Sequence, residues 1–333
     1  MKKTALLRFS LLAACAAGAF QSSFGVITEP VGGVNVNCPN GSDTILSLPF
    51  HGSPAFSGVV SSVSSNTITI GGTPGFTVDE FVSSTSHYAL VFSGALEGLV
   101  LPITANTTDT LTVTTGGVDI STIVADDQLR IIPFCTLADL IPNTAPNGLK
   151  LFPFNMDSAG ENVSASAIYE HFQTFGWYDG GTFVGDYVLY PGEAFIIRNQ
   201  SGSDYSLTFY GNVLACSQRT QIHTLSGGLN QDNHIGLAVP VDVMIGDLNL
   251  GLETNDKLFI YDNSQVAINK SPIRIIEYFD TFGWYDGGTR VDNPADPGNQ
   301  LYLKAGQGYV FRKKSSVSPT SFTWTYTPNY LPF

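Results

Sequence analysis

The sequence has little charge, little histidine and little cysteine. Asp, Glu, Lys and Arg make up only 13% of its 333 residues, and 15 basic residues stand against 28 acidic ones. Nucleic-acid binding depends on clustered Lys and Arg, so we expect no nucleic-acid partner. Five histidines, four cysteines and the absence of a C-x-x-C spacing argue against a structural metal site.

Motifs of catalysis are missing too. The sequence has no Gly-x-Ser-x-Gly elbow, no His-Glu-x-x-His zinc helix, no phosphate-binding loop and no dinucleotide fingerprint. An Asp-x-Asp-x-Asp-Gly calcium loop is also absent. Distant segments can still assemble a catalytic triad, which keeps an exported hydrolase as the least favoured alternative. We predict no catalytic, cofactor-binding or metal-binding residues.

The longest apolar run lies at the N-terminus. Basic residues stand before and within an apolar stretch, residues 5–20, that is too short to span a bilayer. This pattern predicts a signal peptide over residues 1–25, with cleavage after Gly25 or nearer Ala19. The stretch ending in Cys15 also matches a lipoprotein processing box, which would leave an acylated cysteine on a membrane.

Export has consequences for charge, location and cysteine pairing. Removal of residues 1–25 leaves 12 basic and 28 acidic residues, a formal net charge of −16. No later segment has the ~20 apolar residues of a membrane-spanning helix, so we expect none. The mature protein is expected to be extracellular, on the cell surface or periplasmic. Cys38, Cys135 and Cys216 remain after cleavage, and we predict one optional disulfide of open pairing and a buried thiol.

An internal duplication is the strongest signal in the chain. Lys150–Gly181 aligns without a gap with Lys257–Gly288, and 16 of the 32 positions are identical. Both segments end in Thr-Phe-Gly-Trp-Tyr-Asp-Gly-Gly. The offset between the copies grows from 107 to 114 residues at the closing strands, Leu189–Arg198 and Leu303–Arg312. The second copy therefore carries seven extra residues, which we place in a loop around residues 293–299.

The first copy contains a further segment that the second lacks. Its opening strand resembles the opening strand of the second copy, but its next element follows only after more than eighty residues. We predict that residues 53–131 form an inserted β domain, because Val59–Ile70 and Ile103–Thr115 show the alternation of hairpins. The first module then spans residues 26–215 and the second spans residues 216–333.

The fold class predicted from these patterns is all-β. Thr136–Leu140 and Val243–Leu248 are the only plausible short helices, and 34 glycines and 18 prolines suit many strands joined by turns. We expect two related sandwich-like or barrel-like β modules with a small β domain inserted in the first. Phe322–Thr327 alternates aromatics with Thr and is expected to be the last strand of the second module rather than a strand of an outer-membrane barrel.

Several motifs of the duplicated module resemble those of exported bacterial proteins. The second copy has a Leu-x-x-Pro strand end, an Asp-Leu helix, a Gly-Trp turn and a Leu-x-x-Gly-x-Gly-Tyr strand, at Leu237–Pro240, Gly246–Leu248, Gly283-Trp284 and Leu303–Tyr309. The first copy departs at the last motif, where it has Ala194-Phe195. With its Thr28–Gly32 start and its Ile103–Thr108 insert, the chain resembles a paralogous family of signal-peptide-bearing, β-rich bacterial proteins. The resemblance implies export and duplicated modules, and it brings no catalytic residues.

The repeated Gly-Trp-Tyr-Asp-Gly-Gly turns supply the candidate site residues. An aromatic ligand platform could use the six side chains Trp177, Tyr178, Asp179, Trp284, Tyr285 and Asp286. The two carboxylates could suggest glycoside hydrolysis, which needs a pair about 5–10 Å apart, but Asp-Gly-Gly is first of all a turn sequence. A repeated tryptophan is most simply a repeated core residue, so we expect both to be buried.

The closing arginines of the two copies, Arg198 and Arg312, are equivalent and are expected to form ion pairs with the turn aspartates. The function that we predict is a non-enzymatic structural or interaction protein of the cell envelope or exterior. Its partner would be the protein itself, another envelope protein or a polysaccharide. The alternative is a carbohydrate-binding module that uses the Trp-Tyr turns. We expect no cofactor.

Overall fold

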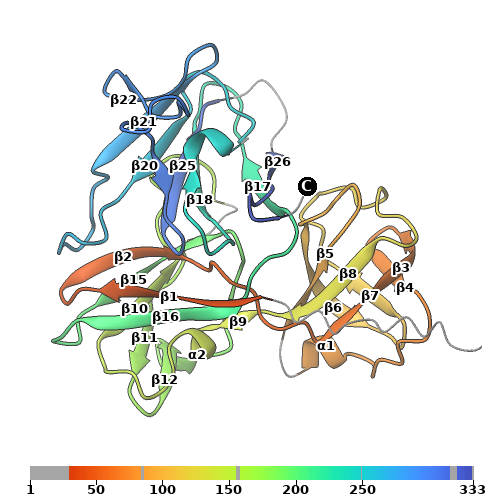
Figure 1. Cartoon of the computed structure of the whole chain (residues 1–333). Coiled ribbons are helices and arrows are strands. Elements are labelled where there is room, and N and C mark those ends of the chain that lie inside the picture. Colours follow the sequence, from red (N-terminus) through yellow and green to blue (C-terminus); the bar gives the residue numbers. More distant parts are fainter. Residues whose placement is uncertain (1–29, 84–85, 155–157, 249, 316–320, 332–333) are drawn as a thin grey trace, which may run out of the picture.

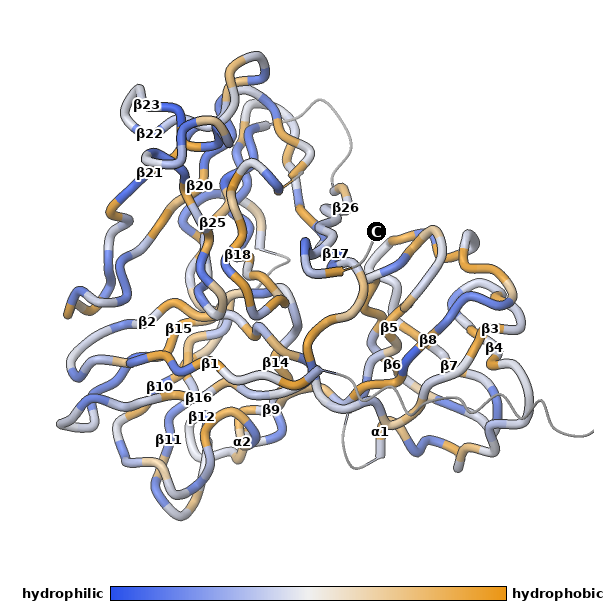
Figure 2. The backbone as a smooth tube through the Cα atoms, in the orientation of Figure 1, coloured by the Kyte–Doolittle hydropathy of each residue, from blue (hydrophilic) through white to orange (hydrophobic). Residues whose placement is uncertain are grey.

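The computed structural model describes residues 30–83, 86–154, 158–248, 250–315 and 321–331. Two six-stranded antiparallel sheets and one closed six-stranded barrel account for most strands (Figure 1). Apolar and polar segments alternate along all three units (Figure 2). The all-β prediction is confirmed. The predicted signal peptide and Cys15 lie outside the described residues.

The first module is built on a sheet with the strand order β13-β12-β11-β10-β15-β2. Two separate strand pairs, the eight-residue pair β1–β16 and the short pair β9–β14, accompany the sheet. The strands of this module are β1 (Val31–Cys38), β2 (Ser42–Ser47), β9 (Cys135–Thr136), β10 (Leu149–Pro153), β11 (Tyr169–Phe172), β12 (Gly176–Asp179), β13 (Thr182–Phe183), β14 (Val188–Leu189), β15 (Ala194–Asn199) and β16 (Tyr205–Asn212).

The second module repeats this arrangement strand for strand. Its sheet has the order β23-β22-β21-β20-β25-β18, and β17–β26 and β19–β24 correspond to the two separate strand pairs of the first module. The strands are β17 (Gln218–His223), β18 (Gln231–Gly236), β19 (Val243–Met244), β20 (Lys257–Ile260), β21 (Arg274–Phe279), β22 (Gly283–Asp286), β23 (Thr289–Arg290), β24 (Tyr302–Leu303), β25 (Gly308–Lys313) and β26 (Ser321–Tyr326). The alternating aromatic segment near the C-terminus thus forms a strand of this module.

The closed barrel lies in the chain between β2 and β9. Its strand order is β3-β4-β7-β6-β5-β8, and its interior is a separate hydrophobic core. Alternate residues of the strands face this core, as period-two patterning requires. On β5 and β8 the outward residues Tyr88, Leu90 and Ile132 join the core of the second module instead of facing solvent. The strands are β3 (Phe56–Ser64), β4 (Thr67–Ile70), β5 (His87–Val91), β6 (Val100–Asn106), β7 (Thr110–Val113) and β8 (Gln128–Pro133).

Helices are short in the described part of the chain. They are α1 (Glu80–Ser83), α2 (Leu137–Leu140) and the 3-10 turn η1 (Ile245–Asp247). Thr136 caps α2 by accepting a hydrogen bond from the backbone N–H of Asp139, whose carboxylate accepts one from the backbone N–H of Thr136 in return. This capping box explains why so short a helix forms here. No helix among the described residues is long and apolar enough to span a membrane.

The two modules face each other through equivalent contacts. Leu46 of the first module bridges Gln307 of the second, and the equivalent Ile235 bridges Glu193. Because each contact has its counterpart with the modules exchanged, the chain folds like a symmetric dimer of one module. Hairpins β11–β12 and β21–β22 lie at opposite ends of this two-module body (Figure 1).

All three described cysteines are free thiols. Cys38 belongs to the core of the first module, whereas Cys216 belongs to the core of the second. The optional disulfide that the sequence allowed is therefore not formed. Cys135, half-buried at the start of β9, also has no disulfide partner.

Candidate functional site

The two tryptophans of the predicted platform are core residues. Trp177 and Trp284 are 0% and 1% exposed. The indole N–H of Trp177 donates to the carbonyl oxygen of Ile141 at 3.3 Å, so its polar edge is also satisfied inside the module. The prediction that both tryptophans are buried is confirmed. The alternative in which the two indole rings form a ligand platform is wrong, because neither ring presents a face to solvent.

The aspartates of the repeated turns are not brought together. Asp179 and Asp286 end β12 and β22, in different sheets, and each is followed by two glycines that reverse the chain. Gly180 and Gly181 have φ values of 52° and 99°, the left-handed conformation that a tight hairpin turn requires. Asp286 accepts a hydrogen bond from Arg274 Nε at 2.6 Å. Both aspartates therefore belong to hairpin ends, and the paired carboxylates of a glycosidase are not assembled.

The closing arginines pair with other aspartates than predicted. Arg198 donates from Nε to Asp43 Oδ1 at 2.6 Å, and Arg312 donates from Nε to Asp232 Oδ1 at 2.6 Å. The expected pairing with the turn aspartates is wrong because of the sheet order. Strand β15 lies beside β2, and β25 beside β18, while the turns lie toward the far edge of each sheet.

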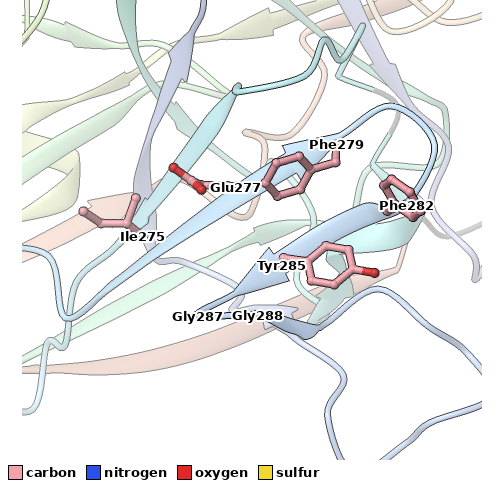
Figure 3. A pocket seen from close by; sticks show the side chains of 7 residues that line it. All are labelled: Ile275, Glu277, Phe279, Phe282, Tyr285, Gly287 and Gly288. Atoms are coloured by element: carbon pink, nitrogen blue, oxygen red, sulfur yellow. The ribbon is translucent and has the colours of Figure 1, made fainter.

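The outer side of hairpin β21–β22 carries a pocket of about 510 Å³ that is open to solvent. Its side chains project from both strands and from the turn between them (Figure 3). We call this surface the second aromatic face, and its lining residues are Ile275, Glu277, Phe279, Phe282, Tyr285, Gly287 and Gly288. Phe282, at the tip of the hairpin, is 60% exposed.

Hairpin β11–β12 carries the equivalent pocket, of about 310 Å³. Its lining residues occupy the same positions of the repeat, 107 residues earlier. This first aromatic face consists of Glu170, Phe172, Phe175, Tyr178, Gly180 and Gly181. Ile168, which corresponds to Ile275, is exposed beside it, and Phe175 at the hairpin tip is 67% exposed. Of the six residues predicted as a platform, the two tyrosines alone line these pockets.

Each face is bordered by one ion pair, whose glutamate lines the pocket and whose lysine lies on the neighbouring strand. On β20, Lys257 lies directly opposite Glu277 of β21, and its Nζ is 2.8 Å from Glu277 Oε1. Lys150 and Glu170 form the same pair in the first module. These side chains are partly exposed, so each pair adds little to stability. Its main consequence is that each aromatic face carries both signs of charge close together.

The two copies agree on the outer side of the hairpin and differ at two positions beneath it. Along each hairpin and just before it, five outward positions are identical: Ile168/Ile275, Glu170/Glu277, Phe172/Phe279, Phe175/Phe282 and Tyr178/Tyr285. Beneath the hairpin, the tryptophan is also retained. The inward position 169 is Tyr in one copy and Ile in the other. Inward position 171 is His in one and Tyr in the other. Residues 153–161 share no identity with residues 260–268, so the copies have diverged widely elsewhere.

This pattern was the signal that sequence reasoning missed. Outward positions of a strand are usually free to vary, whereas inward positions are held by packing. Here the outward aromatic and charged residues are retained and two inward residues have changed. The alternation was visible in the aligned copies, but the sides of the strand became known only with the structure.

The faces offer apolar area, aromatic rings and an ion pair, and they offer no activated nucleophile. Within the described residues, no three His, Cys, Asp or Glu side chains are grouped to hold a metal ion. Burial raises the pKa of the Cys135 and Cys216 thiols to about 12, which suppresses their thiolate forms. The arrangement suits non-covalent binding.

Comparisons of the chain with protein-family models, with curated proteins and with solved structures found no match.

Proposed function

We propose that the protein is a non-enzymatic interaction protein of the cell envelope or exterior, and that it binds its partner through the two aromatic faces. The observation that carries this proposal is the retention of five outward residues in both copies, although two of the residues beneath them changed. Folding alone gives no reason to keep Phe175 and Phe282, which are largely exposed. Clustered exposed apolar side chains are typical of interaction sites.

Two equal faces on one chain make the protein bivalent. Each pocket is open and one-sided, so a single face is expected to bind weakly. Two faces that engage one repeating partner at once gain affinity through the high effective concentration of the second contact. Duplication of a whole module is a direct way to obtain this gain.

The exterior location rests on the sequence. The basic start and the short apolar run of residues 5–20 support export through a signal peptide. The low charge content and the acidic balance support a partner other than nucleic acid.

A polysaccharide is the second candidate partner, favoured by one observation. Tyr178 and Tyr285 line open pockets beside a glutamate, and a tyrosine ring can stack on a sugar while a carboxylate accepts its hydroxyl groups. This candidate uses the tyrosines of the repeated turns without their tryptophans.

Fractionation of the producing cells tests the proposal. The fraction of wild-type protein retained with the envelope is compared with that of the double variant Phe175→Ser/Phe282→Ser, and Tyr210→Ser serves as the control because Tyr210 is 77% exposed outside both faces. We expect the double variant to be released into the medium while the control is retained. Equal retention of all three proteins would show that the faces do not carry the function.

A further inference from the structure

We propose that the occupant of each aromatic face is an aromatic face of a second copy of this chain, and that the protein assembles into linear chains. This inference rests on the proposed function, because it names the partner of the same two faces.

Charge favours self-pairing. The glutamate of each face has a lysine next to it on the neighbouring strand, Lys150 beside Glu170 and Lys257 beside Glu277. When two such faces meet about a two-fold axis, every contact between two residues occurs twice, with the two copies exchanged. The lysine of each copy can then approach the glutamate of its partner, so that no charge is left unopposed. A strongly anionic or cationic partner would leave one member of each pair facing a like charge.

The apolar part of the face is self-complementary in the same way. Phe175 and Phe282 project from the tips of their hairpins and are the most exposed side chains of the two faces. An open pocket lies beside each of them, lined by a second phenylalanine and a tyrosine. In a two-fold arrangement the tip phenylalanine of one copy enters the pocket of the other, and the exchange occurs twice in each contact. Both faces carry the same residues, so either face can pair with either.

The placement of the faces sets the form of the assembly. The hairpins that carry them, β11–β12 and β21–β22, lie at opposite ends of the two-module body (Figure 1), so one contact leaves the other face of each copy free. A chain with two such faces continues the assembly in one dimension, whereas a chain with one face stops at a dimer. Each contact is small, so we expect it to be weak and assembly to need a high protein concentration.

Sedimentation velocity of the mature chain tests this form directly. For the wild type we expect an average mass that rises past the dimer as concentration increases. Phe282→Asp removes one face and should stop at dimers, and Phe175→Asp/Phe282→Asp should stay monomeric. Tyr210→Asp, an exposed aromatic outside the faces, should assemble like the wild type. Because the substituted side chains are largely exposed, the circular dichroism of all variants should match the wild type.

Charge reversal tests the pairing itself. A chain with Lys150→Glu/Lys257→Glu and a chain with Glu170→Lys/Glu277→Lys should each lose assembly, since each meets its own like charge. An equimolar mixture of the two should restore it.

Two results would overturn the inference. One is a wild-type chain that stays monomeric at all concentrations. The other is a mixture that restores nothing. If either occurs while envelope retention still depends on Phe175 and Phe282, the proposed function stands with another partner, and a glycan array then shows whether that partner is a polysaccharide. If retention is independent of both residues, the proposed function falls as well.

Discussion

The backbone N–H of Asn269, in a loop of the second module, donates a hydrogen bond to Asp43 of the first module at 2.6 Å. The equivalent loop of the first module makes the same contact in return, from Asn162 to Asp232 at 2.6 Å. Both asparagines have a φ of 55°. Each module therefore completes the Arg–Asp pair of its neighbour, so these two carboxylates belong to the junction at which the modules are joined.

Loss of charge at this junction should be costly. The Asp43 carboxylate also accepts hydrogen bonds from Nε and Nη2 of Arg198, and its side chain is only 3% exposed. We expect Asp43→Asn to lower the free energy of unfolding by about 2–4 kcal/mol, because a largely buried guanidinium loses its counter-charge. Asp232→Asn should cost less, because Arg312 keeps a second carboxylate partner, Glu161, at 2.6 Å. Urea unfolding at neutral pH measures both, and Glu170→Gln, at a partly exposed pair, should change stability by less than about 1 kcal/mol.

The buried tryptophans should matter for stability. Trp177→Ala and Trp284→Ala each remove a large, fully buried side chain and should destabilise the protein by about 3–5 kcal/mol. Phe175→Ala and Phe282→Ala are matched controls in the same hairpins, and as exposed residues they should change stability by only about 0.5 kcal/mol. Denaturant melts that are unchanged in the tryptophan variants would contradict the role of the indoles as core residues.

The sequence predicted local structure far better than long-range pairing. Hairpin alternation and the short helix expected over Thr136–Leu140 depend on neighbours in the chain, and strands and a helix form there. The partner of Arg198 depends on which strand lies beside β15, and that strand is contributed by residues about 155 positions earlier. Nothing local to either residue encodes this pairing. The reciprocal loop contacts are still harder to foresee, since they require the placement of whole modules.

The free cysteines should be unreactive in the folded protein. Burial raises the pKa of Cys38 to about 11 and of Cys135 and Cys216 to about 12. The thiolate is the reactive species, so very little of it exists at pH 8. We expect no labelling of the native mature chain by Ellman's reagent at pH 8, and labelling of all three thiols after unfolding in guanidinium. Fast labelling of one thiol in the native protein would contradict this burial.

Stability should fall in mild acid because of two buried histidines. Burial lowers the pKa of His51 and of His234 to about 4, from the usual 6.5. Between these values the unfolded chain binds the protons and the folded chain does not, so stability is full above pH 6.5 and is lost as the pH falls toward 4. Each histidine should account for up to about 3 kcal/mol of this loss.

Urea unfolding at a series of pH values from 7.5 to 4 measures this loss, with the double variant His51→Gln/His234→Gln as the comparison. Asp256 shifts stability in the opposite direction as the pH falls, because burial raises the pKa of its carboxyl group. This residue is unchanged in the variant. The difference in slope between the two proteins therefore isolates the histidines. His51 holds the hydroxyl of Tyr88 at 2.6 Å and His234 stacks on Phe154, so the variant is expected to be less stable at pH 7.5. Its stability should nevertheless depend less on pH between 6.5 and 4, and an equal slope in both proteins would show that the histidines are not the cause.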